Sequence, residues 1–460
     1  MHELISKRSV MPTSAEELFA WHERPGAFER LTPSWEKVKV LEQADGIRNG
    51  ARVLLRVGMA GPLGMIWEVA HSDYIAGRQF VDQQVRGPFA YWKHTHTIVP
   101  NGPRGSILED RVEYALPLGM AGRLVAGRFV RKRLGRLFRY RHAITLDDLR
   151  AIEQYRSAGT MKVLISGSTG LVGSALCTAL TTGGHEIARL VRESPRSRQP
   201  EIPWDPANGT IDAAKLEGFD GVVHLSGENI AAGRWTEKQK QRIRDSRVKG
   251  TRLLCETLAK LKQKPKVLVC ASAIGFYGDR GDEVVDESSP AGSNMFLVDV
   301  CKEWESATEP ARSAGIRVVN LRFGIVLSPS GGALAKMLLP FKLGVGGVIG
   351  DGKQYMSWVA LDDAVGAVQH CLMTDSLSGP VNAVAPQAVT NREYTKTLGK
   401  VLTRPTIFPL PASIARLAFG QMADELLLTS THVRPTRLLE SKYVFRYPQL
   451  EGALRHLLGK

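Results

Sequence analysis

Hydrophobic and polar positions alternate with a period of two in several segments of residues 1–157, which is typical of strands with one buried face. The alternation predicts strands at 4–10, 35–43, 51–59, 64–74, 79–85, 91–99 and 106–116, separated by Gly, Asn and Pro turn signals. Ser14 and Glu17 form a capping-box pattern that predicts a short helix after the first strand. Apolar residues at helical spacing predict a long helix over 122–150. Together these elements predict an α+β unit.

From Met161 onward the pattern changes to short apolar runs alternating with helical segments. The runs predict strands at 163–165, 186–191, 221–227, 267–271 and 318–321, and the segments between them predict helices at 171–180, 236–261 and 299–312. Strands that alternate with helices favour an α/β fold with a doubly wound parallel Rossmann sheet. We expect a linker near 152–161 and three domains, at 1–157, 161–385 and 386–460.

Three glycines follow the first apolar run of this second part. Gly167, Gly170 and Gly173 stand between a predicted strand and a predicted helix. Such glycines let the backbone approach a pyrophosphate, which the helix N-terminus binds through its N–H groups and its dipole. The alternative is a strand–helix turn without a ligand. The entropic cost of three spaced glycines favours the dinucleotide site.

The residue type at the end of the second predicted strand indicates which nicotinamide cofactor is preferred. NAD-binding folds place an acidic residue there for the ribose 2′-hydroxyl. This chain has Arg192, with Arg196 and Arg198 nearby, and the nearest acid is Glu193. A guanidinium grips a 2′-phosphate bidentately, so we expect NADP(H) rather than NAD(H). The alternative is a surface Arg192 with Glu193 on the ribose.

Several further motifs carry a family resemblance. They are the segments 167–173, 224–230, 246–251, 272–278, 322–324 and 356–363. With them the chain resembles the extended short-chain dehydrogenases/reductases of the NAD-dependent epimerase/dehydratase superfamily, and within it the atypical YfcH-like members. The tail from about residue 386 resembles the small C-terminal domain of these proteins. The resemblance implies a cofactor site made of Gly167, Ser168, Thr169, Gly170, Leu171, Val172, Gly173, Leu225, Ser226, Gly227 and Lys302. It also implies substrate contacts from Asn229 and Trp358.

The expected catalytic motif of that superfamily is incomplete. Its Tyr-x-x-x-Lys pair keeps Lys302, but Val298 stands at the tyrosine position. The serine position holds Ala273, one residue after Ser272. Tyr277 and Ser272 are the candidate replacements as proton donor or substrate ligand, beside Lys302. Tyr277 is equally interpretable as a packing residue.

The element order of residues 1–157 resembles the helix-grip fold of the START-like (SRPBCC), polyketide cyclase-like superfamily. That resemblance implies a hydrophobic ligand between the sheet and the last helix. The helix is rich in basic residues: Arg128, Arg131, Lys132, Arg133, Arg136, Arg139 and Arg141. An anion-binding surface is one interpretation, and a solvated helix face is the favoured one.

The formal net charge of +15 favours anionic ligands without choosing among them, and no nucleic-acid-binding motif accompanies it. The five cysteines lack C-x-x-C spacing, which argues against a zinc site. Asp362 and Asp363 precede a predicted helix, and at least one of them is interpreted as its cap, so no metal is expected. His224 lies within a predicted strand and is interpreted as a core residue. The N-terminus lacks a signal-like apolar core and no run is long enough to span a membrane, so a cytoplasmic location is expected.

Two functions are compatible with these features. The first is an NADP(H)-dependent oxidoreductase or epimerase that acts on a small molecule. The second is a nucleotide-binding sensor or scaffold that has lost turnover. The nearly intact nucleotide motifs favour the enzyme, and the missing tyrosine and serine favour the scaffold.

Overall fold

The computed structural model describes residues 2–43, 46–58, 64–192 and 199–460. The chain forms two compact units, the first mainly of residues up to Gly159 and the second mainly of residues from Thr160 onward. None of the helices in the described part of the chain combines the length and the apolar character that crossing a bilayer requires.

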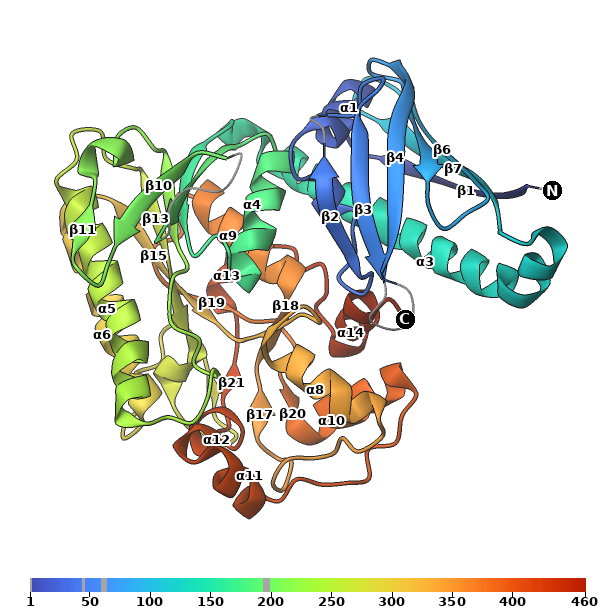
Figure 1. The fold of residues 1–460 in the computed structure, drawn as a ribbon. Coiled ribbons are helices and arrows are strands. Elements are labelled where there is room, and N and C mark those ends of the chain that lie inside the picture. Colours follow the sequence, from blue (N-terminus) through green and yellow to red (C-terminus); the bar gives the residue numbers. More distant parts are fainter. Residues whose placement is uncertain (1, 44–45, 59–63, 193–198) are drawn as a thin grey trace. The chain divides into compact units, whose positions relative to one another are not determined.

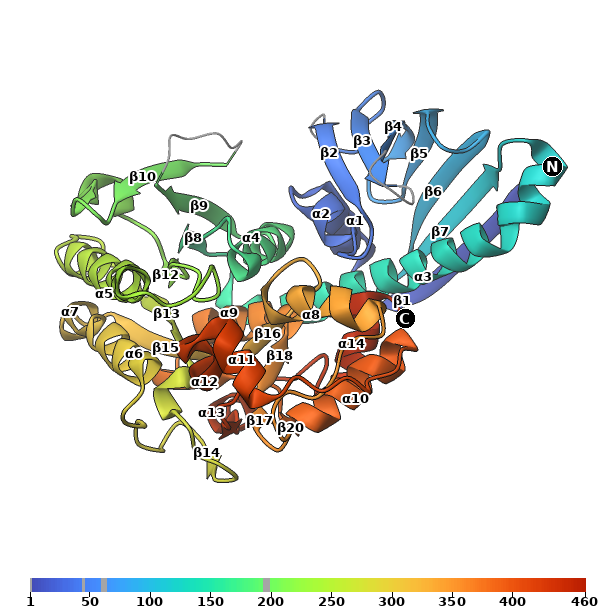
Figure 2. The ribbon, with the colours of Figure 1, turned by 60° about the horizontal axis from the view of Figure 1, so that its bottom comes forward.

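The first unit is a seven-stranded antiparallel sheet with a long helix, α3, against it (Figures 1 and 2). The strand order is β1-β7-β6-β5-β4-β3-β2. The elements are β1 (Glu3–Met11), α1 (Ala15–Glu23), α2 (Ala27–Arg30), β2 (Val38–Gln43), β3 (Arg52–Gly58), β4 (Gly64–Ile75), β5 (Gln79–Arg86), β6 (Tyr91–Pro100), β7 (Ser106–Ala115), α3 (Gly119–Gln154) and the 3₁₀ turn Arg156–Ala158. This confirms the predicted helix-grip arrangement.

Alternating burial in the strands produces the core of this unit. In β6 the residues Trp92, His94, His96 and Ile98 are buried, and their neighbours in the strand are not. The inward side chains of β6 and β7 pack against Leu134 and Phe138 of α3. Of the seven basic residues singled out in the sequence, two form ion pairs within the unit, Arg131 with Glu3 and Arg133 with Glu36.

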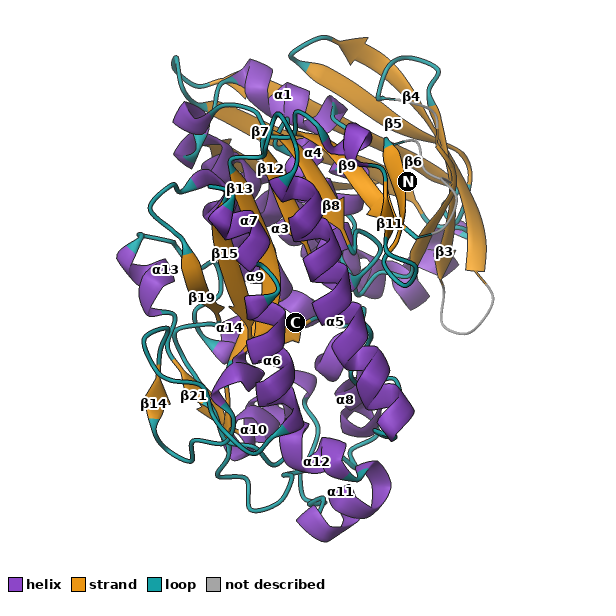
Figure 3. Ribbon diagram, turned by 90° about the vertical axis from the view of Figure 1, so that its left-hand side faces the viewer, coloured by secondary structure: helices purple, strands orange, loops and turns teal. Residues whose placement is uncertain are grey.

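The second unit is built on an eight-stranded sheet in the order β11-β10-β9-β8-β12-β13-β15-β19, parallel except for the β10–β11 pair. Figure 2 shows α5, α6 and α7 on one face of this sheet and α4 and α9 on the other, and Figure 3 shows α5 and α6 from the side. The elements are β8 (Lys162–Ser166), α4 (Leu171–Thr182), β9 (Glu186–Val191), β10 (Glu201–Asp205), β11 (Thr210–Ile211), β12 (Gly221–His224), α5 (Glu237–Ala259), β13 (Val267–Ala273), α6 (Phe296–Ser306), α7 (Glu309–Ser313), β15 (Arg317–Phe323), α9 (Leu361–Met373) and β19 (Gly379–Ala383). The predicted doubly wound Rossmann fold is confirmed.

Shorter elements complete the second unit. They are β14 (Val284–Val285), β16 (Ile325–Leu327), α8 (Gly332–Lys342), β17 (Tyr355–Met356), β18 (Trp358–Ala360), β20 (Val389–Thr390), α10 (Asn391–Leu402), α11 (Ala412–Phe419), α12 (Gln421–Leu426), β21 (His432–Val433), α13 (Thr436–Glu440), α14 (Leu450–Leu458) and the 3₁₀ turns Ala213–Leu216 and Ile274–Tyr277. Leu454 and Leu457 of α14 share one apolar cluster with Leu327 and Trp358. By its contacts, the segment after residue 385 is therefore part of the second unit.

Two local predictions were wrong. The single helix expected over 299–312 is two helices, α6 and α7, because Pro310 lies in the first turn of α7 and a proline cannot continue a preceding helix. Asp362 and Asp363 do not cap α9, whose N-cap is Ala360. Instead the Asp363 carboxylate accepts hydrogen bonds from the backbone N–H groups of Arg446 and Tyr447, at 2.7 and 2.9 Å. Burial raises the pKa of Asp363 to about 6.

Candidate cofactor-binding site

The glycine turn after β8 lies directly against the chain that follows β12. Gly167 has φ +70°, a left-handed conformation, and a Cβ there would lie 2.7 Å from the carbonyl carbon of Leu225. A Cβ at Gly173 would lie 2.2 Å from the Gly167 oxygen. Packing alone therefore requires glycine at these two positions. Gly170 is different, because it is exposed and a Cβ there would meet only the Gly167 oxygen, at 3.2 Å. The bare surface at Gly170 leaves the outer side of the turn open to a ligand.

The turn stands where the order of strands in the sheet reverses. From β8 the chain continues outward to β9 and β10, then returns to β12 on the other side of β8. The carboxyl ends of β8 and β12 bound the crevice in which open α/β sheets bind their ligands. α4 begins at Leu171, so its N-terminal N–H groups and dipole face this crevice. The structure thus brings together the residues predicted from Gly167 to Gly173 and from Leu225 to Gly227.

Arg192 is exposed just after β9, and Glu193, Arg196 and Arg198 lie outside the described residues. Another arginine, Arg189 within β9, contacts the glycine turn: its Nε donates to the Ser168 hydroxyl at 2.9 Å. Arg189 also pairs with Glu201 of β10, at 3.3 Å. The Ser168 hydroxyl is therefore fixed by an arginine whose charge is already paired with Glu201.

Arg247 of α5 is a candidate ligand that the sequence analysis did not single out. A Cβ at Gly227 would lie 3.3 Å from its guanidinium carbon, so the cation lies against the loop after β12. The guanidinium stacks over Trp304, at 5.0 Å, and donates one hydrogen bond to the Ile243 carbonyl at 3.1 Å. In the described part of the chain it forms no ion pair, and burial lowers the pKa of Arg247. Remaining N–H donors beside Gly227 suit a phosphate oxygen. The Ser-Arg-x-x-Gly-Thr motif at 246–251 was the available signal.

His224 lies under the crevice and is fully buried. Its Nδ1 is 2.6 Å from the Ser166 hydroxyl and its Nε2 is 3.0 Å from the Thr251 hydroxyl. Burial lowers the pKa of His224 to about 4, so the ring is neutral at physiological pH. It is a hydrogen-bonded core residue that joins β8, β12 and α5.

The two candidate proton donors, Ser272 and Tyr277, lie in one buried network at the carboxyl ends of β13, β15 and β19. Ser272 donates to Glu305 at 2.7 Å. Both oxygens of Glu305 accept from Arg322, at 2.7 and 2.8 Å. The Tyr277 hydroxyl accepts from Arg322 at 2.9 Å and donates to Asn382 at 2.8 Å. Tyr277 is fully buried, and burial raises its pKa to about 12, so its phenol stays protonated.

Lys302 lies apart from this network. It is exposed on α6, one turn after the buried Val298 that stands at the usual tyrosine position. A fully buried valine leaves no hydroxyl for the lysine to act on.

The two predicted substrate contacts also lie in different surroundings. Asn229 is exposed after β12, and its side-chain oxygen accepts from the backbone N–H of Ala231 at 2.9 Å. Trp358 is fully buried in β18 within an apolar cluster. Asn229 therefore has the access that a substrate contact needs, whereas Trp358 packs the interior.

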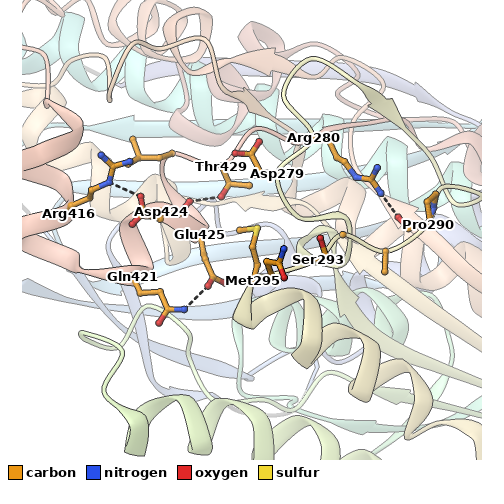
Figure 4. A pocket seen from close by; sticks show the side chains of 14 residues that line it. Asp279, Arg280, Pro290, Ser293, Met295, Arg416, Gln421, Asp424, Glu425 and Thr429 are labelled. Carbon is orange, nitrogen blue, oxygen red and sulfur yellow. Dashed lines mark hydrogen bonds and ion pairs between the residues drawn. The ribbon is translucent and has the colours of Figure 1, made fainter.

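A polar pocket of about 740 Å³ lies between the loop 290–295 and the helices α11 and α12 (Figure 4). Glu425 points along one wall, and its two oxygens accept from the backbone N–H groups of Phe296 and Leu297, at 3.1 and 2.9 Å. It thereby caps α6, the helix that carries Lys302. Arg416 pairs with Asp424 at 2.8 Å, and Arg280 donates to the Pro290 carbonyl at 2.6 Å.

Three family models match the chain. Residues 163–383 match the NAD dependent epimerase/dehydratase family, residues 410–457 match a domain of unknown function (DUF1731), and residues 11–138 match the polyketide cyclase / dehydrase and lipid transport family. An epimerase family protein of Mycobacterium bovis is 43% identical over 292 residues, which are 64% of this chain and 96% of that protein. The human epimerase family protein SDR39U1 is 36% identical over 302 residues, which are 65% of this chain and 100% of that protein.

The chain belongs to the NAD-dependent epimerase/dehydratase family. The resemblance predicted from its motifs is thereby confirmed, as is that of the first unit to the polyketide cyclases.

Two solved structures extend the comparison. The crystal structure of the nucleoside-diphosphate sugar epimerase from Corynebacterium glutamicum has a TM-score of 0.80 at 32% identity and covers 99% of this chain and 90% of its own. The crystal structure of human SDR39U1 (isoform 2) with NADPH has a TM-score of 0.60 at 34% identity. The match covers 65% of this chain and 99% of the human chain.

Proposed function

We propose that the second unit binds NADP(H) in the crevice between β8 and β12 and exchanges a hydride between the nicotinamide and a small-molecule substrate. The observation that carries the proposal is the open turn at Gly170, at the N-terminus of α4 and beside the exposed Gly227 and the partly buried Arg247. The 34% identical human relative, which was crystallised with NADPH, supports the same cofactor.

The preference for NADP(H) rests on Arg192. It is exposed at the end of β9, where a ribose 2′-phosphate lies in folds of this kind. Arg247 would bind the pyrophosphate, because it keeps free donors beside the loop after β12. The chain's own part is to hold the cofactor and orient the substrate, while the nicotinamide supplies the hydride.

Nucleoside-diphosphate sugars are the substrate class that we propose, with an epimerisation in which the cofactor is regenerated in each turnover. The 32% identical bacterial relative supports this class, since its crystal structure is described as that of a nucleoside-diphosphate sugar epimerase. The polar pocket between the loop 290–295 and the helices α11 and α12 is the candidate place for the sugar. Tyr277 and Ser272 stay the predicted candidates for proton donor or substrate ligand, and Lys302 stays the predicted ribose ligand.

A second function, nucleotide binding without turnover, is favoured by one observation. Both hydrogen-bonding directions of the Tyr277 hydroxyl are used inside the protein, and Val298 is buried where a catalytic tyrosine is expected. A protein of this kind binds the cofactor and leaves the substrate unchanged.

Calorimetric titration of the full chain with NADPH and NADH tests the cofactor. We expect NADPH to bind at least about 10-fold more tightly, and Arg192→Ala to lower the affinity for NADPH alone, because one charged phosphate contact is worth about 1.5–3 kcal/mol. Arg252→Ala is the matched control, since Arg252 is exposed on α5 and pairs only loosely with Glu256, at 3.9 Å. Equal affinities would refute the role of Arg192, and no binding of either nucleotide would refute the proposed function.

Turnover separates the two functions. We expect a panel of nucleoside-diphosphate sugars, incubated with the NADPH-loaded or NADP⁺-loaded protein, to contain one whose NMR spectrum shows the epimer. Unchanged spectra across the panel, together with tight NADPH binding, would favour the scaffold.

A further inference from the structure

The first unit buries a group of titratable side chains that has no part in the proposed cofactor site. His71 lies on β4, Asp82 on β5, His94 and His96 on β6, Asp110 on β7 and His142 on α3. The strand register explains the grouping. Asp82 is paired with His71 on one side and with His94 on the other, and His96 is paired with Asp110. His94 and His96 both point inward because they are two residues apart in a strand.

Three atoms converge on one point of this group. Asp82, His94 and His96 each offer a ligand atom, and these atoms lie within 4.8 Å of one another. The Asp82 Oδ2 is 3.3 Å from Nε2 of His96 and 3.5 Å from Nδ1 of His94. Two ligands of one tetrahedral zinc ion, each about 2.0–2.1 Å from the metal, are about 3.3–3.5 Å apart. The spacing therefore fits a shared ion.

The opposite nitrogen of each ring faces a second carboxylate, Asp110. Its Oδ1 is 2.6 Å from Nδ1 of His96 and 3.3 Å from Nε2 of His94. Its Oδ2 is 2.9 Å from Nε2 of His142, whose Nδ1 is 2.8 Å from the Ser9 hydroxyl. Metal-ligating histidines typically donate their other N–H to a carboxylate in this way, which fixes the tautomer and the ring orientation.

A count of protons shows what the convergence needs. A neutral imidazole has one N–H and one lone pair. If His94 and His96 both donate to Asp110, both lone pairs face Asp82, whose oxygen is also negative. If both rings are protonated instead, two cations lie with ring centroids only 3.8 Å apart. A metal cation between the two lone pairs and the Asp82 oxygen removes both repulsions, and a proton on one ring alone is the other arrangement that avoids the pair of cations.

We propose that Asp82, His94 and His96 bind one divalent transition-metal ion, with Asp110 and His71 orienting the ligands. The two imidazoles and one carboxylate are the donor set of zinc and non-haem iron sites. The His71 Nδ1 lies 2.7 Å from the other oxygen of Asp82 and so fixes that carboxylate. Three protein ligands leave a coordination position for water or a ligand carbonyl, as in catalytic rather than structural zinc sites.

The side chains of the proposed site differ in their exposure to solvent. The side chains of His94, His96 and Asp110 are 2%, 5% and 4% exposed, whereas that of Asp82 is 22% exposed. Asp82 is therefore the member of the proposed site that solvent reaches most readily.

A protonated His96 is the alternative occupant. Although burial alone would lower it, the charge of Asp110 and the hydrogen bonds to both carboxylates raise the pKa of His96 to about 9. In that case one proton takes the place of the metal, and the cluster binds no ion.

Metal binding by the full chain distinguishes these two outcomes. The protein is stripped with a chelator, dialysed, and titrated with Co²⁺ and with Zn²⁺, followed by calorimetry and by the visible spectrum of Co²⁺. We expect one equivalent to bind, with the intense visible bands of a four-coordinate Co²⁺ site, and Zn²⁺ to displace it. Absence of these bands, or of binding of one equivalent, in the wild-type protein would overturn the proposal. This titration needs no variant.

Variants assign the ligands. We expect His94→Ala and His96→Ala to lower the Co²⁺ affinity at least about 100-fold, and Asp110→Asn to lower it about 10- to 100-fold, the usual effect of removing an outer partner. His22→Gln is the matched control, because His22 is buried in the same unit and its Nδ1 contacts the Leu18 carbonyl instead of the carboxylates. Binding that is unchanged in a folded His94→Ala, His96→Ala double variant would place the ion elsewhere and overturn the assignment.

Discussion

In the second unit Arg322 is buried against one carboxylate whose two oxygens it satisfies, whereas in the first unit two carboxylates face four histidines at once. The Arg322 network is complementary, because Ser272, Tyr277 and Asn382 complete it with donors and acceptors that match. In the His94–His96 cluster the two rings lie between two carboxylates, and an added metal ion or a proton is needed to relieve the repulsion between lone pairs and carboxylate oxygens.

This contrast distinguishes two kinds of buried polar network. One holds its own side chains in position, and the other is able to bind an ion. A saturated network has nothing left to offer a ligand and restricts the residues around it. A convergent cluster keeps lone pairs that an added metal ion or a proton can satisfy. The cofactor crevice uses a third arrangement, in which backbone N–H groups and one unpaired arginine face an open surface.

The largest expected effect tests whether the Arg322 network is saturated. Glu305→Gln leaves the Arg322 guanidinium, which is 4% exposed, without a counter-charge, and should lower the free energy of unfolding by about 3–5 kcal/mol. Glu303→Gln on the same helix breaks an exposed pair with Arg244 and should cost less than about 1 kcal/mol. Urea denaturation of both variants measures the contrast. Equal losses would mean that the buried pair is no more important than the surface one.

A pH experiment tests the buried histidine of the second unit, His224. His224 has a folded pKa of about 4, below its ordinary value of 6.5, because it is buried without a carboxylate. Its contribution to stability is complete above pH 6.5 and is lost as the pH falls toward 4, by up to about 3 kcal/mol.

We therefore expect His224→Asn to reduce the difference in unfolding free energy between pH 7 and pH 5. Lys460→Ala, at an exposed position, is a control that should leave this difference as it is in the wild type. An unchanged difference in the His224 variant would show that this ring is not the group responsible.

Arg247 tests the third arrangement, the open crevice. Arg247→Ala removes the unpaired cation beside Gly227 and should weaken NADPH binding about 10- to 100-fold, the value of one charge-assisted contact. Arg252→Ala, one turn further along α5 and exposed, should change the affinity less than about 2-fold. Calorimetry measures the NADPH affinity of both variants. Similar affinities of the two variants would show that Arg247 does not bind the cofactor.

The smallest effect concerns Tyr277. Tyr277→Phe removes one hydroxyl from a network in which Arg322 and Asn382 keep other partners, so we expect a loss of about 1–2 kcal/mol in stability and an unchanged NADPH affinity. The same variant, assayed on a substrate once found, tests the predicted proton relay. A fall of 100-fold or more in kcat, with KM unchanged, would make Tyr277 a catalytic residue.

The two sites differ in how far the sequence predicts them. The glycine turn is local, so Gly167, Gly170 and Gly173 were visible together between a strand and a helix. Arg247 was visible only as part of a motif, because its position beside Gly227 depends on how α5 packs. The proposed metal site was not predicted, since its residues come from positions 71, 82, 94, 96 and 110 on four strands and only the strand register brings them together.

Hydrogen exchange measured by mass spectrometry, with and without NADPH, tests the central claim most directly. We predict that NADPH slows exchange in peptides covering residues 166–175 and 225–228 of the wild type, and that Gly173→Val abolishes this protection because its side chain would collide with the Gly167 oxygen. Gly452→Ala, where an added Cβ meets nothing within 4 Å, should leave the protection intact. Protection that is absent from both peptides in the wild type would contradict a nucleotide site between β8 and β12.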